Sequence, residues 1–432
     1  MTEKSSGQLG SEMMEYSRRL FPICRSITGN GVRETLRIIK EICNDLEIHE
    51  IPSGTKVFDW EVPEEWNIRD AYIIDPDGNK IIDFKTNNLH VMGYSEPVDK
   101  TLSLDELKEH IYTQVDLPDT VPYVTSYYKK RWGFCMSENM RAAMKDGYYK
   151  VFIDSDFKQG NLTYGELLIG GRSKSEILIS TYVCHPSMAN NEVSGPVLAA
   201  FLGNYIRSLS NRRYSYRIVF LPETIGSISY LSKNYTYMKK HTIAGFVLSC
   251  VGDNRTFSHL QSPYGNTMAD KVLRNVLSFI DPEYKVYSFL ERGSDERQYC
   301  APNINLPVCC FCRSKFGEYP EYHTDQDNLE LISKEGFEGS FSVMSQCIEA
   351  LEYNKFYKVT CMCEPQLGKR GLYPTLSKKG SATAVKAMTD LIAYADGTND
   401  LIDISNIINV QVAELIPIIK TLKTARLIKT VK

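Results

Sequence analysis

The chain has 432 residues, of which 43% are hydrophobic and 24% are charged, and its net charge at pH 7 is −3. This composition excludes a disordered chain and fits two or three domains, and the weak negative charge excludes a general affinity for nucleic acid. No apolar run reaches the roughly 18 to 20 residues of a membrane span, and the first twenty residues lack the apolar core of a signal peptide. We therefore predict a cytoplasmic protein, without a membrane partner.

The first 160 residues predict a helical start followed by a small domain. Residues 11–45 have helical periodicity that is interrupted at Gly29 and Gly31, and EIHEIP at 47–52 follows as a strand. From residue 52 onward, short strand-like runs alternate with turn signals, and DPDG at 75–78 predicts a β-hairpin. We predict that residues 52–160 form an inserted small α+β domain.

Residues 161–360 alternate between strand and helix patterns. Four apolar strand candidates are TYGELLIGG, EILISTYVCH, YRIVFLPE and IAGFVLSCVGD, and the helical runs GPVLAAFLGNYIRSL and MADKVLRNVLSFI lie among them. This order is typical of an α/β domain, a mostly parallel mixed sheet with helices on both faces, which we assign to residues 1–51 and 161–360. Ligands of such sheets bind beyond the carboxyl ends of the strands, where His185, Glu223 and Asp253 lie.

The C-terminal segment, residues 366–432, reads as three helices and a strand, an order that resembles a winged helix. It holds ten Lys and Arg against five Asp and Glu, which would suit a nucleic-acid contact. Its presumed recognition helix, VAELIPIIKTLKTARL, is mostly apolar and has few groups that could reach base edges. We therefore expect it to pack on protein, on the α/β domain or a second subunit, and not to bind a specific nucleic-acid sequence.

Two histidines and several acids are candidates for a metal site. His185 and Glu192 lie seven residues apart in TYVCHPSMANNEVSGP, and His323 lies in YPEYHTDQDNLE between Glu321 and Asp325. Imidazole nitrogens and carboxylate oxygens are ligands of Zn²⁺. A lone histidine is more often a structural hydrogen-bonding group, so the order of these residues along the chain carries the prediction.

That order resembles the zinc aminopeptidases of the co-catalytic exopeptidase clan and the related glutaminyl cyclases. The resemblance covers about residues 160–355 and rests on five motifs, which are His185, the Ser194-Gly195 loop end, Glu223-Thr224-Ile225-Gly226, Ser294-Asp295 and Tyr322-His323-Thr324. More closely, the whole chain resembles bacterial proteins in which an aminopeptidase-like domain carries a small insertion and a C-terminal winged helix. Members of that group are often associated with polysaccharide biosynthesis, which is what the resemblance implies.

The resemblance also shows departures from the family pattern. The family's metal-bridging Asp falls on Asn191, its second glutamate falls on Thr224, and a further ligand Asp falls on Ser249, with Asp253 as a substitute. Neutral side chains at these positions make two zinc ions hard to hold. We therefore predict one zinc per chain rather than two.

We predict a zinc-dependent hydrolase of an amide bond, similar to an aminopeptidase, that acts on a small peptide or an N-acyl or aminoacyl substrate. His185, Glu192 and His323 are the predicted ligands, with Glu321 and Asp325 orienting the His323 ring. Glu223 is the predicted general base, Asp295 a second catalytic carboxylate, and Arg297, Asn191 and Tyr322 substrate contacts. Arg297 has an alternative role in a salt bridge with Asp295 or Glu296. The alternative function is a decayed, ligand-binding regulator that signals through its winged helix, and the sequence leaves open whether the chain forms a homo-oligomer.

Overall fold

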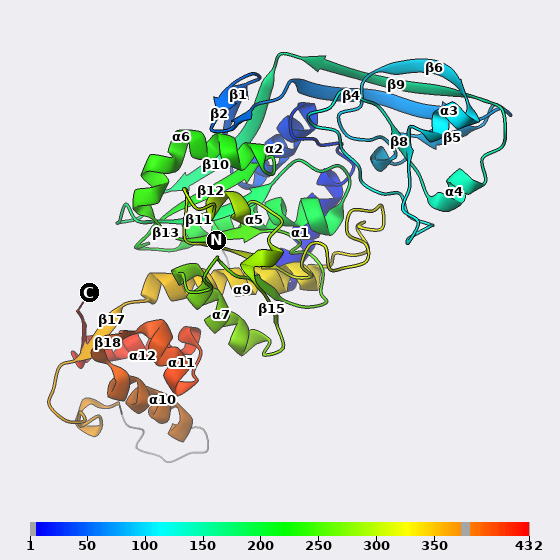
Figure 1. Ribbon diagram of the computed structural model, residues 1–432. Coiled ribbons are helices and arrows are strands. Elements are labelled where there is room, and N and C mark those ends of the chain that lie inside the picture. Colours follow the sequence, from blue (N-terminus) through cyan, green and yellow to red (C-terminus); the bar gives the residue numbers. More distant parts are fainter. Residues whose placement is uncertain (1–5, 373–380, 432) are drawn as a thin grey trace. The chain divides into compact units, whose positions relative to one another are not determined.

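The structure is a computed structural model, and it describes residues 6–372 and 381–431. The chain forms two compact units, residues 1–264 with 285–341 and residues 265–284 with 342–432. The division passes through helix α9 (Lys334–Tyr353). Each unit has its own sheet (Figure 1).

The first unit is built on the largest sheet of the described residues, which has eight strands. Their order is β1 (Glu47–Pro52), β10 (Asn161–Ile169), β12 (Ser215–Leu221), β11 (Glu176–Tyr182), β13 (Thr242–Leu248), β16 (Val308–Cys312), β14 (Ser258–Leu260) and β15 (Lys285–Tyr287). The central strands β12, β11, β13 and β16 are parallel, whereas β10 and β14 pair antiparallel with them. The predicted fold class, a mostly parallel mixed sheet, is confirmed.

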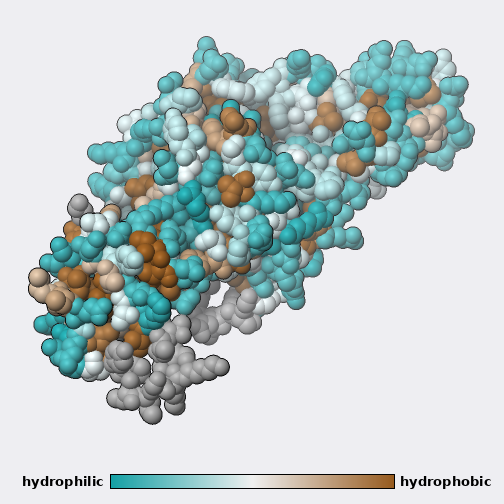
Figure 2. Space-filling view, turned by 60° about the horizontal axis from the view of Figure 1, so that its bottom comes forward, coloured by the Kyte–Doolittle hydropathy of each residue, from teal (hydrophilic) through white to brown (hydrophobic). Residues whose placement is uncertain are grey.

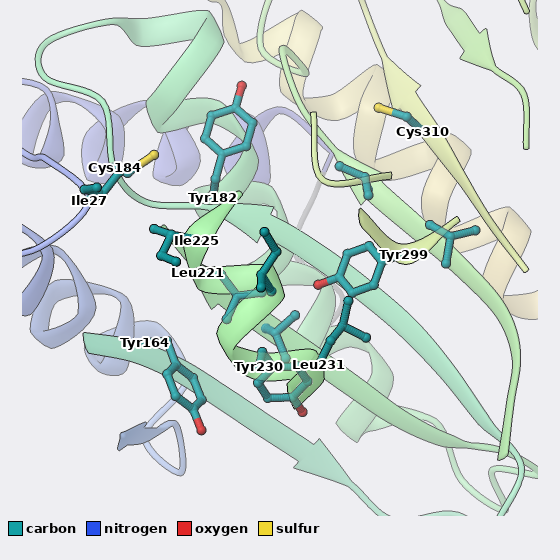
Figure 3. Close-up of a cluster of buried hydrophobic side chains, with 14 of the residues drawn as sticks. Ile27, Tyr164, Tyr182, Cys184, Leu221, Ile225, Tyr230, Leu231, Tyr299 and Cys310 are labelled. Carbon is teal, nitrogen blue, oxygen red and sulfur yellow. The ribbon is translucent and has the colours of Figure 1, made fainter. Parts of the chain in front are cut away.

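Helices cover both faces of this sheet, which is why every residue of β11 is buried. One face carries α1 (Ser6–Leu20), α2 (Asn30–Ile42) and α5 (Ser194–Ser208), and the other carries α6 (Ile225–His241) and the short α8 (Glu296–Tyr299). Ile225 and Tyr230 of α6 and Tyr299 of α8 belong to the same buried cluster as Leu221 at the end of β12 (Figure 3). On the opposite face, a Cβ atom at Gly195 would lie 2.3 Å from Thr181 Oγ1, so glycine lets α5 approach β11 closely.

The segment between β1 and β10 forms the inserted sheet, in the order β5 (Lys80–Asp83), β4 (Glu65–Ile74), β9 (Tyr148–Lys158) and β6 (Val98–Ser103). The β4–β5 pair is the hairpin predicted at DPDG. Smaller elements complete this region, and they are α3 (Leu104–Lys108), α4 (Glu138–Ala142) and the strand pairs β2 (Lys56–Val57) with β3 (Trp60–Glu61) and β7 (Ile111–Tyr112) with β8 (Phe134–Cys135). Its own core includes Trp132, Phe134 and Val151.

Glu65 ties the start of β4 to helix α2. Its carboxylate accepts hydrogen bonds from Arg33, from the Asn67 amide at 3.1 Å and from the Asn161 N–H at 3.1 Å, and its side chain is 3% exposed. Burial raises the pKa of Glu65, but the hydrogen bonds from Arg33, Asn67 and Asn161 outweigh burial and lower it to about 2.

We expect Glu65→Gln to lower the free energy of unfolding by about 1–3 kcal/mol at pH 7, because it removes a charged acceptor from three donors. The carboxylate stabilises the fold above its ordinary pKa of 4.5, and this contribution is lost as the pH falls to about 2. The difference between variant and wild type should therefore vanish in acid. Urea unfolding at several pH values measures it, with the exposed Glu61→Gln as control. A difference that stays constant with pH would contradict this role of Glu65.

The second unit contains the winged helix. Its elements are α7 (Met268–Ile280), β17 (Phe356–Val359), α10 (Ser381–Tyr394), β18 (Asp396–Asp400), α11 (Leu401–Ile408), α12 (Val412–Thr424) and β19 (Ile428–Thr430). Strand β17 pairs with both β18 and β19, and it lies ahead of residue 366, the predicted start of this domain. Helix α7 joins the same unit, since Lys271 lies 2.7 Å from carboxylate oxygens of both Asp400 and Asp403.

No single helix of the described ranges is long and apolar enough to cross a membrane. By length and composition only, α11 and α12 pass that test as a pair, bent by 115°.

Candidate functional site

A pocket of about 370 Å³ opens beyond the carboxyl ends of β11 and β12. Cys184 and His185 follow β11, and Glu223 and Thr224 follow β12, because parallel strands end at the same edge of a sheet. Arg297 comes from α8, and His323 from the loop after β16. The remaining lining residues are Ile27, Trp60, Tyr123, Thr125, Tyr127, Tyr128 and Ile225. The inserted region therefore supplies most of the aromatic wall.

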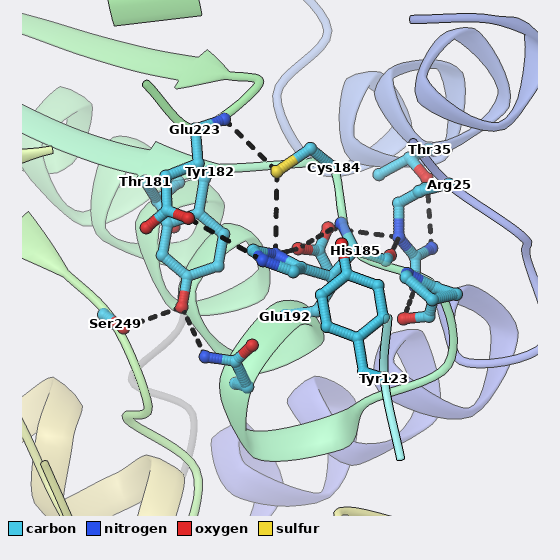
Figure 4. Close-up of polar contacts among 12 residues, drawn as sticks. Arg25, Thr35, Tyr123, Thr181, Tyr182, Cys184, His185, Glu192, Glu223 and Ser249 are labelled. Atoms are coloured by element: carbon cyan, nitrogen blue, oxygen red, sulfur yellow. Dashed lines mark hydrogen bonds and ion pairs between the residues drawn. The ribbon is translucent and has the colours of Figure 1, made fainter. Parts of the chain in front are cut away.

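His185 is held in one orientation by Glu192. Its Nδ1 lies 3.0 Å from Glu192 Oε2, and its backbone N–H donates to the same oxygen at 2.9 Å. Its Nε2 lies 3.7 Å from Glu223 Oε2 (Figure 4). Burial lowers the pKa of His185, but the hydrogen bond to Glu192 and the charge of Glu223 outweigh burial and raise it. With Nδ1–H bonded to Glu192, the imidazole presents Nε2 to the Glu223 side.

Glu192 in turn is paired with Arg25, and each of these side chains is 1% exposed. Arg25 Nε lies 3.1 Å from Glu192 Oε1 and also donates to the carbonyl of His185 at 2.9 Å (Figure 4). Glu192 sits on a π-helical turn, Ala189–Val193, directly before α5. Both carboxylate oxygens thus face His185 and Arg25, and Glu192 does not line the pocket.

Cys184, His185 and Glu192 bring three ligand-type atoms within 4.8 Å of one another. A cation bound there would use His185 Nδ1, which already bonds to Glu192, and would lie beside the positive guanidinium of Arg25. Burial raises the pKa of the Cys184 thiol well above its ordinary value, so the thiolate form that binds metals is disfavoured. This group is therefore a poor cation site.

His323 presents an unused ring nitrogen. Its Nε2 is buried and has no hydrogen-bond partner within residues 6–372 and 381–431. The ring stacks on Tyr322 at 3.9 Å between centroids and lies 5.6 Å from the ring of His185. Burial, together with the charge of His185, lowers the pKa of His323 to about 3, which keeps the imidazole neutral.

The acids beside His323 are used elsewhere. Glu321 forms two hydrogen bonds with Arg255, at 2.8 and 2.9 Å, and Asp325 accepts the N–H of Val121 at 2.9 Å. Their predicted role in orienting the His323 ring is therefore wrong. The ring packs instead against Tyr322 and, edge to face, against Tyr123, and the N–H of Tyr123 donates to the His323 carbonyl at 2.8 Å.

Glu223 and Asp295 form a pair of interacting acids. Asp295 Oδ1 accepts hydrogen bonds from the Thr224 N–H at 2.8 Å and the Ser227 hydroxyl at 2.7 Å. Burial and the charge of Glu223 raise the pKa of Asp295 to about 7. Burial also raises the pKa of Glu223, despite the opposing effect of His185. The charge of Glu223 therefore opposes the ionisation of Asp295.

Two of the three positions that lack the family's carboxylates, Asn191 and Ser249, are tied together by Tyr182. The Tyr182 hydroxyl lies 2.7 Å from the Ser249 hydroxyl and accepts a hydrogen bond from the Asn191 amide at 2.8 Å (Figure 4). Asp253 does not replace them, because it accepts hydrogen bonds from Asn190 and Ser314. A network of neutral side chains therefore joins two residues that stand where the resemblance expects metal-binding carboxylates.

Comparisons with known proteins agree with this architecture. Residues 14–354 match the model of a domain of unknown function, DUF4910, and residues 355–430 match a winged helix-turn-helix. The chain belongs to the DUF4910 family. A relative from Clostridium acetobutylicum, provisionally named a polysaccharide biosynthesis protein with an aminopeptidase-like domain, is 46% identical over 404 residues, or 93% of this chain and 92% of that protein.

Solved structures give the same fold. A crystal structure from Clostridium acetobutylicum, provisionally named a peptidase, is 44% identical to this chain with a TM-score of 0.92. The match covers 99% of this chain and 97% of the Clostridium acetobutylicum chain. The match to the zinc aminopeptidase BSAP of Bacillus subtilis covers 80% of this chain and 94% of BSAP, with a TM-score of 0.56 and 13% identity. At that identity the likeness shows the fold alone. This chain therefore has an aminopeptidase-like α/β fold and a winged helix, as predicted.

The structure brings four of the eight predicted site residues to the pocket, namely His185, Glu223, His323 and Arg297. Glu192, Asn191, Asp295 and Tyr322 lie behind its wall. The sequence analysis did not identify Arg25 and Tyr182, which do not line the pocket but bond to residues around it. Arg25 pairs with Glu192, and Tyr182 bonds to Asn191 and Ser249. Arg25 lies in a loop 160 residues before His185, and no motif in the sequence connects the two.

Proposed function

We propose that this protein is a metal-dependent amide hydrolase that acts in the pocket of His185, Glu223 and His323. The observation that carries the proposal is the unused, buried Nε2 of His323, next to a second imidazole whose Nε2 is also turned away from its Glu192 partner. Buried acceptors without a partner are rare in folded proteins. This nitrogen, beside the imidazole of His185 and the carboxylate of Glu223, suits a cation site.

The histidine pair fits one zinc ion. With Zn–N bonds near 2.0–2.1 Å and a tetrahedral angle, two imidazole ring centres bound to one ion lie roughly 5 Å apart, and these rings are 5.6 Å apart. Glu192 fits better as the carboxylate that orients His185, a partner commonly found behind zinc-bound histidines. The Tyr182 network argues against a second ion.

The side chains then have separate tasks. Zinc would lower the pKa of a water and polarise the carbonyl of the amide. Glu223 would accept a proton from water and pass it to the leaving nitrogen, which its raised pKa favours. Asp295, behind Glu223, holds the Thr224 N–H and so fixes the turn that carries Glu223. Zinc analysis, followed by an amide-substrate screen with zinc, manganese or cobalt, tests the proposal, and metal-loaded protein without any turnover would favour the binding-protein alternative.

For the winged helix we propose a packing role. Leu415, Ile419 and Leu422 of α12 are buried within its own unit, and Lys420 lies over the Tyr353 ring. Figure 2 shows hydrophobic side chains at the surface of this unit. Tyr394 and Ile407 are 42% and 47% exposed. Such residues suit a contact with protein, and a second copy of the chain is one candidate.

We therefore expect no sequence-specific DNA binding by the intact protein. Five basic residues lie on α12 and the segment that follows it; Lys420, Lys423, Arg426 and Lys429 are described, and Lys432 lies outside the described residues. Four cations would give only a few phosphate contacts. A salt-sensitive mobility shift of one defined duplex at sub-micromolar protein, lost in the Lys420→Gln/Lys423→Gln variant, would contradict this.

We place the protein in the cytoplasm and in polysaccharide biosynthesis. All twelve cysteines are free thiols, nine of them buried, which suits a reducing compartment. The second assignment is supported by the name of the Clostridium acetobutylicum relative.

A further inference from the structure

Arg297 is a cation of the pocket that forms no ion pair among the described residues. Its Nη2 donates to Thr224 Oγ1 at 2.5 Å, and its Nε is buried and has no hydrogen-bond partner among the described residues. In the same residues no carboxylate lies within 4.0 Å of the guanidinium, so the predicted salt bridges to Asp295 and Glu296 are absent. A buried N–H such as this Nε normally has an acceptor, and a guanidinium often binds a carboxylate through two parallel hydrogen bonds.

The charges of the pocket favour an anion over an amine. Among its lining residues, Arg297 is the one permanent cation and Glu223 the one carboxylate. A substrate ammonium group would have to bind Glu223, which the proposed reaction needs as a free base. An anionic group can bind Arg297 without interfering with that base.

Aromatic side chains form the rest of the wall. Trp60 and Tyr128 are 41% and 55% exposed, and their rings meet edge to face at 5.8 Å. Tyr123 and Tyr127 lie deeper, with their hydroxyl groups 2.8 Å apart. Exposed rings at a pocket wall suit an apolar or ring-shaped acyl group.

We infer that the substrate is an N-acyl amino acid or a close analogue, with its carboxylate on Arg297, its amide beside Glu223 and its acyl group against Trp60 and Tyr128. This inference rests on the proposed function. The hydroxyl of Thr224 accepts a hydrogen bond from Arg297, and Thr224 follows Glu223 directly in the chain. Arg297 is thus connected through one residue to the proposed base. Hydrolysis breaks the C–N bond, the hydroxyl of water goes to the acyl carbon and its proton to the leaving nitrogen, and a carboxylic acid and an amino acid are released.

Calorimetric titration of the metal-loaded protein with three probes tests the inference. The probes are N-benzoylglycine, which is anionic, N-benzoylglycinamide, which is neutral, and phenylalaninamide, which is cationic. We expect N-benzoylglycine to bind about 10- to 100-fold more tightly than the neutral amide, as hydrogen bonds to a charged group imply. Arg297→Met should abolish this preference, Arg297→Lys should keep part of it, and Arg292→Met, at an exposed arginine, should keep all of it.

The wild-type comparison needs no variant to fold. Tighter binding of phenylalaninamide than of N-benzoylglycine, failure of all three probes to bind, or an unchanged preference in Arg297→Met would each overturn the inference. An anion preference without hydrolysis would contradict the proposed function but support the anion site. Hydrolysis of amides without a preference for the anionic probe would support the proposed function but contradict the anion site.

Discussion

Glu223→Gln should keep the zinc content of the wild-type protein and lower the rate of amide hydrolysis by about two to four orders of magnitude. Glutamine has nearly the same shape but cannot take a proton from water. The side chain is 21% exposed and points its Oε2 to within 3.7 Å of His185 Nε2, so it can reach a reacting water in the pocket. Steady-state kinetics and metal analysis of the same preparation measure both quantities.

The wild-type rate should also fall in acid. Burial raises the pKa of Glu223, so the base is protonated, and inactive, at a higher pH than an exposed glutamate would be. Glu318→Gln, at a half-exposed glutamate outside the pocket, serves as the control and should leave the rate unchanged. An unchanged rate in Glu223→Gln would remove the base from this position, and lost zinc would make Glu223 a ligand.

The α/β sheet was predictable because the sequence of each central strand is itself typical of a buried strand. Strands β11 and β12 are mostly apolar, and each ends at a proline-containing turn with a polar residue, His185 or Glu223. Strand β18, with the sequence DGTND, has no apolar pattern and exists because β17 pairs with it. Such a strand is set by its partner, and its own sequence does not show it.

The site was predictable in part for the same reason. Parallel strands bring His185 and Glu223 to one edge, but His323 reaches them through a loop whose course depends on tertiary contacts. The direction of the Glu192 carboxylate is decided by Arg25, which neutralises it behind the pocket. A glutamate that binds a metal and a glutamate that orients a histidine have the same residue type and spacing in the sequence. The contact between Glu192 and the distant Arg25 indicates the orienting role.

The purified protein should contain about one zinc per chain, and His185→Ala or His323→Ala should each lose it. Removing one of the two imidazoles leaves a single proposed protein ligand, fewer than the three that usually hold a catalytic zinc ion. Glu192→Gln should behave differently, because Glu192 acts through the Nδ1–H of His185. We expect it to weaken zinc affinity about 10- to 100-fold, the usual cost of losing an orienting partner.

Plasma emission after dialysis, with a competing chelator for the affinities, gives these values, and circular dichroism checks that each variant folds. His49→Ala is the matched control, because it removes a histidine from strand β1 outside the pocket and should leave zinc unchanged. Undiminished zinc in both pocket variants would remove the metal from this site. Complete loss of zinc at every chelator concentration in Glu192→Gln would return Glu192 to the ligand role, because a carboxylate that only orients His185 leaves both Nε2 donors in place.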